Sequence, residues 1–205
     1  ANGNSCRSIT EKYMKSFSVF FATLLSVVFH PIFIPTYAYL LYSYRFLPMF
    51  SFLSFALVFL FTAIIPSLSI VVLYKLKTVS SLTLEDAKDR KYPYLITLVS
   101  YQILIFLLGR FGDYFFYYIC LAMLCLALVT CINLFWKISA HMTALGVMIV
   151  MIMSQAYIEN QNPYELFVVF FFLAGLIAYA RIKLKSHTLL QTLAGFLLCF
   201  FVLFI

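Results

Sequence analysis

The sequence predicts an all-α, polytopic membrane protein whose transmembrane helices, about seven in number with six as the alternative, form one bundle. Hydrophobic residues make up 65% of the 205 residues, charged residues only 10%, and the mean hydropathy is +1.04. Soluble domains carry roughly 25% charged residues. Because backbone that faces lipid must satisfy its own hydrogen bonds, long apolar runs have to form helices or a closed barrel. These runs are continuous rather than short and alternating, which favours helices.

The chain divides into a polar segment, residues 1–16, and a single transmembrane domain, residues 17–205. Part of the polar segment is expected to derive from cloning. A bilayer core of about 30 Å requires roughly 20 apolar helical residues, with a range of about 17 to 25. The runs that meet this requirement, in order, are 17–43, 47–74, 93–109, 114–135, 140–157, 164–180 and 188–205.

The first two runs are longer than a bilayer requires, so we expect their helices to tilt or to project into water. Pro31 and Pro35 lie inside the first run and are expected to kink it. His30, beside Pro31, is interpreted as a histidine packed against a neighbouring helix. A role in a substrate channel is the alternative for His30.

Several of the later runs begin at helix start signals. The third run begins at Pro93, and proline is common in the first turn of a helix. Ser139 precedes the fifth run and is a candidate N-cap. Thr188 and Gln191 match the S/T-x-x-E/Q capping box at the start of the last run.

Seven crossings would place the amino terminus and the linkers 75–92, 136–139 and 181–187 on one side of the membrane. Twelve of the fourteen cations fall on that side, and only Arg45 and Arg110 fall on the other. The positive-inside rule therefore assigns that side to the cytoplasm, and we expect a bacterial inner membrane. Cations kept for binding an anion would bias this count. The cleaner indicators lie away from the predicted site and are Lys12, Lys15, Lys75 and Lys77.

Three polar segments meet on this side, each at a membrane boundary: "KDRKYP" (88–93), "KISAH" (137–141) and "ARIKLKSHTLLQ" (180–191). Together they supply cations, a hydroxyl group and two histidines, and ionisable groups near a membrane core suggest function. A phosphate group is their simplest common ligand, because arginine binds its oxygens in a bidentate manner and lysine adds charge.

Two histidines are sufficient for phosphoryl transfer in such a site. A neutral imidazole can attack phosphorus to form a phosphohistidine, and a second imidazole can protonate the leaving group. Arginine and lysine can take the place of a metal ion in neutralising the phosphate. The prediction is therefore a site without metal or other cofactor.

The spacing Arg181-x5-His187-x3-Gln191, with Ser139-Ala140-His141 and Arg90-x-x-Pro93 upstream, resembles the signature of the type 2 phosphatidic acid phosphatase superfamily over about 100 residues. That pattern is K-x6-R-P, P-S-G-H and S-R-x5-H-x3-D. The resemblance implies a phosphohistidine mechanism. It assigns His187 as nucleophile, His141 as acid and then base, Gln191 as the residue that orients His187, and Arg90, Lys88, Lys91, Lys137, Ser139 and Arg181 as phosphate ligands.

The chain departs from the family pattern at several positions. Thr83 stands where the first motif has lysine, and Ile138, Ala140 and Ala180 replace a proline, a glycine and a serine. Gln191 replaces the aspartate that orients the nucleophilic histidine. A glutamine carbonyl can accept the imidazole N–H, but it cannot offset the positive charge that develops on the ring. Loss of the equivalent carboxylate in serine proteases lowers kcat by about 10⁴, so slow turnover or none is expected.

Each candidate also has a structural explanation. His187 and Arg181 could extend to the interface from an apolar surface, Gln191 could serve only the capping box, and residues 88–93 could be an ordinary charged loop. We predict a phosphatase acting on a lipid phosphate or prenyl diphosphate, with membrane lipids and no nucleic acid as partners. The alternative is an impaired homologue that binds anionic lipid, or an anion or lipid carrier. The oligomeric state is left open.

Overall fold

The computed structural model describes the backbone of residues 3–46, 50–84 and 86–203, and all of the described residues lie in helices, turns or loops. Side chains are described from Ser16 onward, outside the two gaps and up to Val202. The helical elements are α1 (Gly3–Val28), α2 (Ile34–Arg45), α3 (Phe52–Phe59), η1 (Leu60–Ile64), α4 (Ile65–Lys75), η2 (Lys88–Arg90), α5 (Lys91–Arg110), α6 (Phe116–Asn133), α7 (Ala140–Ile158), α8 (Tyr164–Lys183) and α9 (Leu189–Leu203).

Five helices in the described part of the chain are long and apolar enough to cross a membrane, and they identify an integral membrane protein. They are Phe52–Lys75, Lys88–Arg110, Phe116–Asn133, Ala140–Ile158 and Tyr164–Lys183. The predicted all-helical membrane fold is therefore confirmed, whereas the count of about seven crossings is not. The first predicted run is broken between α1 and α2, and the apolar parts of the first and last helices, Ser16–Val28 and Leu189–Val202, are shorter than the other five.

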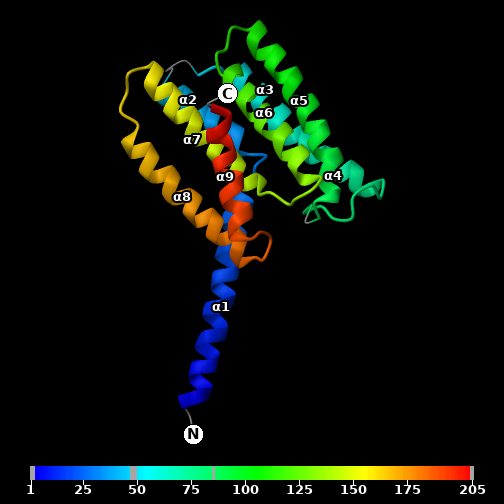
Figure 1. Ribbon diagram of the computed structural model, residues 1–205, viewed down its shortest axis with the longest axis vertical. Helices are drawn as coiled ribbons and strands as arrows, with labels where there is room; N and C mark the ends of the chain where they lie inside the picture. Colours follow the sequence, from blue (N-terminus) through cyan, green and yellow to red (C-terminus); the bar gives the residue numbers. More distant parts are fainter. Residues whose placement is uncertain (1–2, 47–49, 85, 204–205) are drawn as a thin grey trace.

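The expected kink at Pro31 is a complete break. α1 ends at Val28, a turn covers residues 29–33, and α2 begins at Ile34 with Pro35 in its first turn. Proline has no N–H to continue a helix, but its fixed φ suits a helix start. Figure 1 shows the amino-terminal half of α1 extending away from the other helices, while its end at the break enters the bundle.

The second predicted run forms one continuous helix with a π-helical turn in the middle. α3, η1 and α4 follow one another over Phe52–Lys75. Pro66 lies two residues after the end of this turn and has no N–H to donate to the carbonyl groups of η1. The Ser100 hydroxyl of α5 donates instead to the Phe61 carbonyl oxygen at 2.6 Å. A backbone group freed by proline is thereby satisfied by a neighbouring helix, as membrane helices require.

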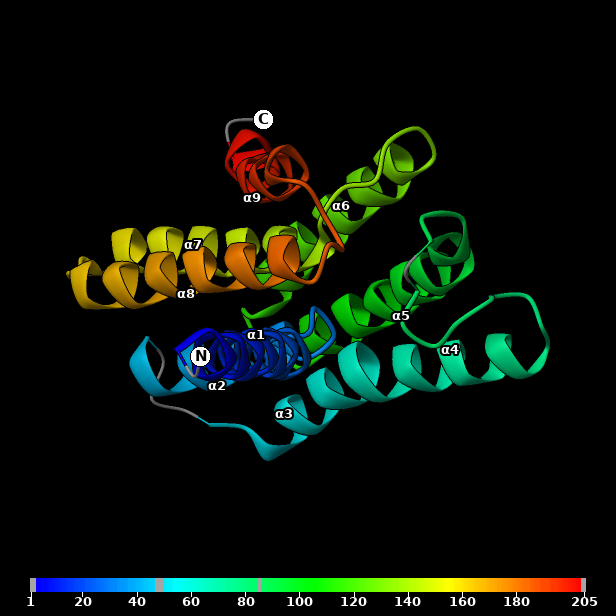
Figure 2. The ribbon, with the colours of Figure 1, turned by 90° about the horizontal axis from the view of Figure 1, so that it is seen from below.

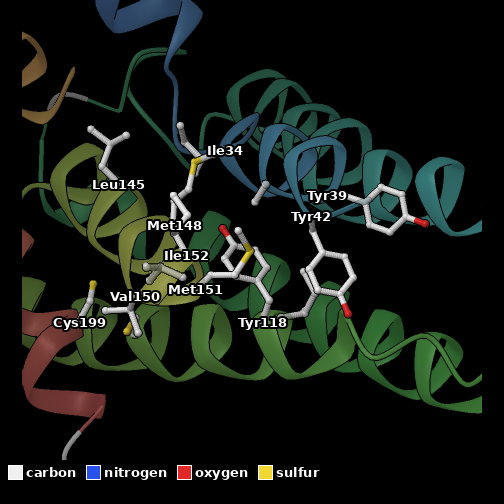
Figure 3. Close-up of a cluster of buried hydrophobic side chains, with 14 of the residues drawn as sticks. Ile34, Tyr39, Tyr42, Tyr118, Leu145, Met148, Val150, Met151, Ile152 and Cys199 are labelled. Atoms are coloured by element: carbon white, nitrogen blue, oxygen red, sulfur yellow. The ribbon is translucent and has the colours of Figure 1, made fainter. Parts of the chain in front are cut away.

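α7 is the central helix of the bundle. Within its apolar window 67% of the residues are buried, against 17 to 28% for the other four spanning helices. α7 packs against α9, α8 and α6, and Figure 2 shows α7 and α8 side by side beneath α9. Figure 3 shows its side chains Met148 and Ile152 among Ile34 of α2 and Tyr118 of α6. The start of α7, which carries His141, is therefore held from several sides.

Two glycines allow α7 and α9 to approach closely. A Cβ atom on Gly195 would lie 2.6 Å from the Ser139 carbonyl oxygen, and one on Gly146 would lie 2.7 Å from the Phe196 carbonyl oxygen. Small residues at helix contacts are typical of membrane bundles, because they let backbones come together. These two contacts hold the middle of α9 against the first half of α7.

We predict that Gly195→Ala and Gly146→Ala each destabilise the protein by about 1–3 kcal/mol, because the added methyl group collides with backbone atoms that cannot move independently. Gly175→Ala in α8 is the matched control, since a Cβ atom there meets no atom within 4 Å. Helix propensity alone would make that control neutral or up to about 1 kcal/mol more stable. Thermal unfolding in detergent measures the difference. Equal effects at all three positions would show that α7 and α9 are not in close contact.

Candidate functional site

A cavity of about 150 Å³ lies among α2, α4, α5, α6 and α7, and the three predicted polar segments all contribute to its lining. Two arginines and three histidines stand out in its described lining, beside several threonine and tyrosine hydroxyl groups: Arg90, Arg181, His30, His141 and His187. We call it the histidine cavity. Four of these five residues are candidates from the sequence, and they come from positions up to 97 residues apart in the chain.

The rest of the lining of the histidine cavity is mostly apolar. Tyr101 of α5, Tyr118 and Val129 of α6, Val147 of α7 and Ile70 of α4 belong to this part. All five lie on helices that are apolar enough to cross a membrane. The cavity thus combines cationic and imidazole groups with a surface suited to hydrocarbon.

Arg90 is buried and is tied to two separate segments. Its Nε donates to the Leu84 carbonyl oxygen at 2.9 Å, and its Nη1 donates to the Ile138 carbonyl oxygen at 3.3 Å. The first bond closes the loop before α5, and the second reaches the residue before Ser139. Arg90 therefore links Leu84 to the start of α7, while its guanidinium group lines the cavity.

His141 is held by the broken end of α1. Because α1 stops at Val28, the carbonyl groups of its last turn lack helical donors. The Ser26 carbonyl oxygen lies 3.0 Å from His141 Nε2. A carbonyl oxygen can only accept, so His141 carries its proton on Nε2 in this contact and keeps a lone pair on Nδ1. The break near Pro31 thus frees a carbonyl group that positions His141, and the sequence motifs did not indicate this contact.

His30 is the one polar side chain of the cavity that was interpreted as a packing residue. Its ring lies edge to face against His141, with 5.2 Å between the ring centroids and 81° between the planes. The Ile32 backbone N–H donates to His30 Nδ1 at 3.4 Å, which leaves the His30 proton on Nε2. The sequence shows that His30 lies beside a helix-breaking proline. It does not show that the His30 ring packs against His141 of α7, because that contact depends on the tertiary structure.

The end of α8 explains the five-residue spacing between Arg181 and His187. Lys185 adopts a left-handed backbone conformation with a φ of 55°. The Lys185 N–H donates to Ile182 O at 2.9 Å, and the Ser186 N–H donates to Arg181 O at 3.1 Å. This pair of bonds is a Schellman motif. The His187 N–H also approaches Arg181 O, at 3.3 Å, so the chain folds back and brings both side chains to the same cavity.

Gln191 makes the contacts that both of its expected roles require. The Thr188 N–H donates to Gln191 Oε1 at 3.1 Å, and the Gln191 N–H donates to Thr188 Oγ1 at 3.4 Å, which is the predicted capping box. His187 Nδ1 lies 3.2 Å from the same Oε1 atom. Because a backbone N–H identifies this atom as the oxygen, His187 must donate from Nδ1. Its Nε2 lone pair is left available.

Ser139 and Lys137 lie beside the histidine cavity without belonging to its lining. The Ser139 N–H donates to Gln191 O at 3.3 Å, which joins the starts of α7 and α9. The expected capping bond from the Ser139 hydroxyl is not formed, and among the described residues that buried oxygen has no hydrogen-bond partner. Lys137 is half-buried, and its charge acts on His187.

Lys88 and Lys91 were expected with the other phosphate ligands, but the structure places them in a second hollow. That hollow lies between the start of α5 and the end of α6, and its lining includes Tyr94 and Asn133. Tyr94 also lines the histidine cavity, so the two spaces are neighbours. Residues 88, 90 and 91 share one turn but point to different sides of it.

His187 lies between α8 and α9, outside the spanning helices, and its surroundings disfavour the protonated ring. Burial, followed by the positive charges of Arg90 and Arg181, lowers the pKa of His187 to about 3, although the hydrogen bond to Gln191 opposes this shift. The imidazole is therefore neutral at neutral pH. A neutral ring with a free Nε2 lone pair is the form that can act as a nucleophile.

Searches against protein-family models, curated proteins and solved structures give no match for this chain. Within the described part of the chain, no group of three or more His, Cys, Asp or Glu residues is placed to hold a metal ion.

We predict that His187 titrates with a pKa near 3, against about 6.5 for an unperturbed histidine, and that Arg181→Gln raises this pKa by removing a nearby positive charge. Arg110→Gln, in the last turn of α5, is the control and should leave it unchanged. Because the unfolded chain takes up this proton first, His187 makes the free energy of unfolding fall as the pH drops from about 6.5 towards 3. Histidine NMR of the solubilised protein, assigned with His187→Gln, measures the pKa. A value near 6.5 would contradict the neutral, buried ring.

Proposed function

We propose that this protein is a membrane-integral phosphatase that removes a phosphoryl group from a lipid phosphate or diphosphate. The observation that carries the proposal is the geometry of His187. Its Nδ1 proton is held by Gln191, and its ring lines the same cavity as His141 and the two arginines. The resemblance of these residues to the type 2 phosphatidic acid phosphatase signature supports the same conclusion.

In the first step of this mechanism, the Nε2 lone pair of His187 forms a bond to phosphorus. The bond from phosphorus to the lipid oxygen breaks, and its electron pair stays on that oxygen. His141 takes up a second proton, at Nδ1, when the anionic substrate binds beside it. It then gives this Nδ1 proton to the leaving oxygen, because its Nε2–H is held by the Ser26 carbonyl group. Arg90 and Arg181 bind the non-bridging oxygens and neutralise their charge.

In the second step, water attacks the phosphorus of the phosphohistidine. His141, now neutral, accepts a proton from that water at Nδ1. The nitrogen–phosphorus bond breaks, its electron pair returns to His187 Nε2, and inorganic phosphate leaves. The step requires no metal ion, because the arginines and the nearby Lys137 supply positive charge around the phosphate.

The substrate class follows from the two kinds of lining in the cavity. The phosphate or diphosphate group binds beside Arg90 and Arg181, and the acyl or prenyl chain lies along the apolar wall that includes Tyr101 and Val147. A hydrocarbon chain bound between spanning helices can enter from the bilayer.

We further propose seven membrane crossings, in which the broken pair α1–α2 and the short helix α9 complete the five long helices. This topology places the histidine cavity at the cytoplasmic face of a bacterial inner membrane, because most of the cations then lie on that side.

Gln191 favours one alternative from a different functional class, a non-catalytic protein that binds anionic lipid. A neutral amide can hold the Nδ1 proton of His187, but it cannot stabilise the imidazolium charge of the covalent intermediate. Such a protein would keep the phosphate contacts of Arg90 and Arg181 and lack turnover.

His187→Ala is expected to abolish phosphate release from a panel of lipid phosphates and prenyl diphosphates, because it removes the atom that attacks phosphorus. Lys183→Ala, which removes an exposed cation outside the cavity, is the control and should retain the activity. Equal rates for the wild-type protein and His187→Ala would exclude this mechanism. No release from either protein, together with a vanadate-induced rise in melting temperature that Arg181→Gln removes, would identify the lipid-binding alternative.

Gln191→Glu is expected to raise kcat by at least about tenfold, given the much larger effect of the equivalent carboxylate in serine proteases. Glutamate has the same length as glutamine, so its carboxylate can accept from both the Thr188 N–H and His187 Nδ1 while adding negative charge. Gln191→Leu is expected to lower kcat, because it releases the His187 tautomer.

Melting temperatures of both variants separate the effect on catalysis from the effect on the capping box. An unchanged or lower kcat for Gln191→Glu, in a protein of wild-type stability, would show that Gln191 does not act through His187.

A further inference from the structure

The second hollow, between the start of α5 and the end of α6, has the composition of a binding site of its own. Its volume is about 160 Å³, and its polar lining consists of Lys88, Lys91, Tyr94, Thr130 and Asn133. None of the three histidines of the first cavity belongs to it. We call it the lysine hollow.

Asn133, the last residue of α6, is the first sign that the lysine hollow binds a ligand. The residue is only 9% exposed, and neither Nδ2 nor Oδ1 has a hydrogen-bond partner among the described residues. Leaving a buried polar group unsatisfied costs roughly 1–3 kcal/mol, and here both a donor and an acceptor are involved. A leucine at this position would avoid that cost, so stability alone does not account for the amide.

The charges around the hollow favour an anion as the group that satisfies Asn133. Lys88 and Lys91 are three residues apart on one turn, and both line the hollow. They stand at the start of α5, where the helix dipole also favours negative charge. Asp89, which lies between them in sequence, is bonded through its carboxylate to the Ser80 backbone N–H and hydroxyl group. Water alone would satisfy an amide but would not require two lysines on the same wall.

The position of the lysine hollow suits the headgroup of a bilayer lipid. Leu134, Phe135 and Trp136 follow Asn133 directly and are exposed, with Phe135 at 91%. Exposed aromatic residues at the end of a spanning helix mark the headgroup level of a membrane. Basic pockets between transmembrane helices are known lipid-headgroup sites.

We propose that the lysine hollow binds the phosphate headgroup of an anionic bilayer lipid, separately from any substrate in the histidine cavity. Lys88, Lys91 and the Asn133 amide N–H groups bind the phosphate oxygens, and Asn133 Oδ1 accepts from a hydroxyl group of the headgroup. Tyr94 lines both spaces, so a bound lipid would steady the turn that carries Arg90. This inference goes beyond the proposed phosphatase activity and does not depend on it.

The test compares melting temperatures of the full chain in nanodiscs of phosphatidylcholine alone and of phosphatidylcholine with added phosphatidylglycerol. A ligand that binds only the folded protein raises its melting temperature. We expect phosphatidylglycerol to raise it for the wild-type protein. Asn133→Leu and the pair Lys88→Gln with Lys91→Gln should lose most of this increment. In phosphatidylcholine alone, Asn133→Leu should melt at the wild-type temperature or above it, because two unsatisfied polar atoms have been removed.

The pair Lys183→Gln with Lys185→Gln is the matched control, because it removes the same charge from exposed positions outside the hollow. It should keep the increment, as should Arg181→Gln, which alters only the histidine cavity. An equal loss in the matched pair would attribute the effect to general surface charge and overturn the proposal. The proposal would also be overturned if Asn133→Leu and the Lys88→Gln with Lys91→Gln pair both kept the full rise in melting temperature with phosphatidylglycerol.

A further arm adds inorganic phosphate to the phosphatidylcholine nanodiscs. An increment that appears with free phosphate, disappears in Asn133→Leu and has no counterpart with phosphatidylglycerol would overturn the assignment to a lipid headgroup. Because none of these measurements uses phosphate release, failure of the phosphatase proposal and failure of this one are distinguishable.

Discussion

The polar backbone groups at helix ends inside the bundle must find partners within the protein, and this constraint builds the histidine cavity. The break in α1 leaves the Ser26 carbonyl without a helical donor, and His141 takes that place. The end of α8 turns back so that the Arg181 carbonyl accepts from the His187 backbone. The start of α9 is capped by Gln191, whose side-chain oxygen also holds the His187 ring. Each histidine of the proposed mechanism is therefore positioned by the completion of a helix end.

Close packing of α7 and α9 brings these separate helix ends together. Gly195 and Gly146 permit backbone contacts that any Cβ atom would prevent. The Ser139 N–H can then reach the Gln191 carbonyl oxygen, which joins the segment of His141 to the segment of His187. The site consequently depends on the interior of the bundle rather than on flexible loops, although its polar groups come from loops and helix starts.

The fold class and three segments of the site could be predicted because charge is rare in apolar sequence, so that Arg90, His141 and His187 stand out at membrane boundaries. A kink at Pro31 could also be predicted, but not that it is a complete break. The contributions of Ser26 and His30 could not be predicted either, because they depend on how α1 and α2 meet α7. Successive helical residues point about 100° apart. Which of Arg90 and Lys91 faces the histidine cavity depends on how the helix is rotated in the bundle, and the sequence does not show that rotation. A single asparagine at the end of an apolar run gives no signal before its burial is known.

In the proposed mechanism, Gln191 would help to bind a phosphate group without activating His187 for attack on it. The described lining of the histidine cavity includes Arg90 and Arg181 but no Asp or Glu. A phosphate dianion would weaken the repulsion that keeps His187 unprotonated and would itself offset charge on the ring once the nitrogen–phosphorus bond forms. An orienting carboxylate would supply that offset before the bond forms, which is when it lowers the barrier. A cavity with glutamine in this place is therefore suited to bind a phosphate dianion more effectively than it accelerates attack on it.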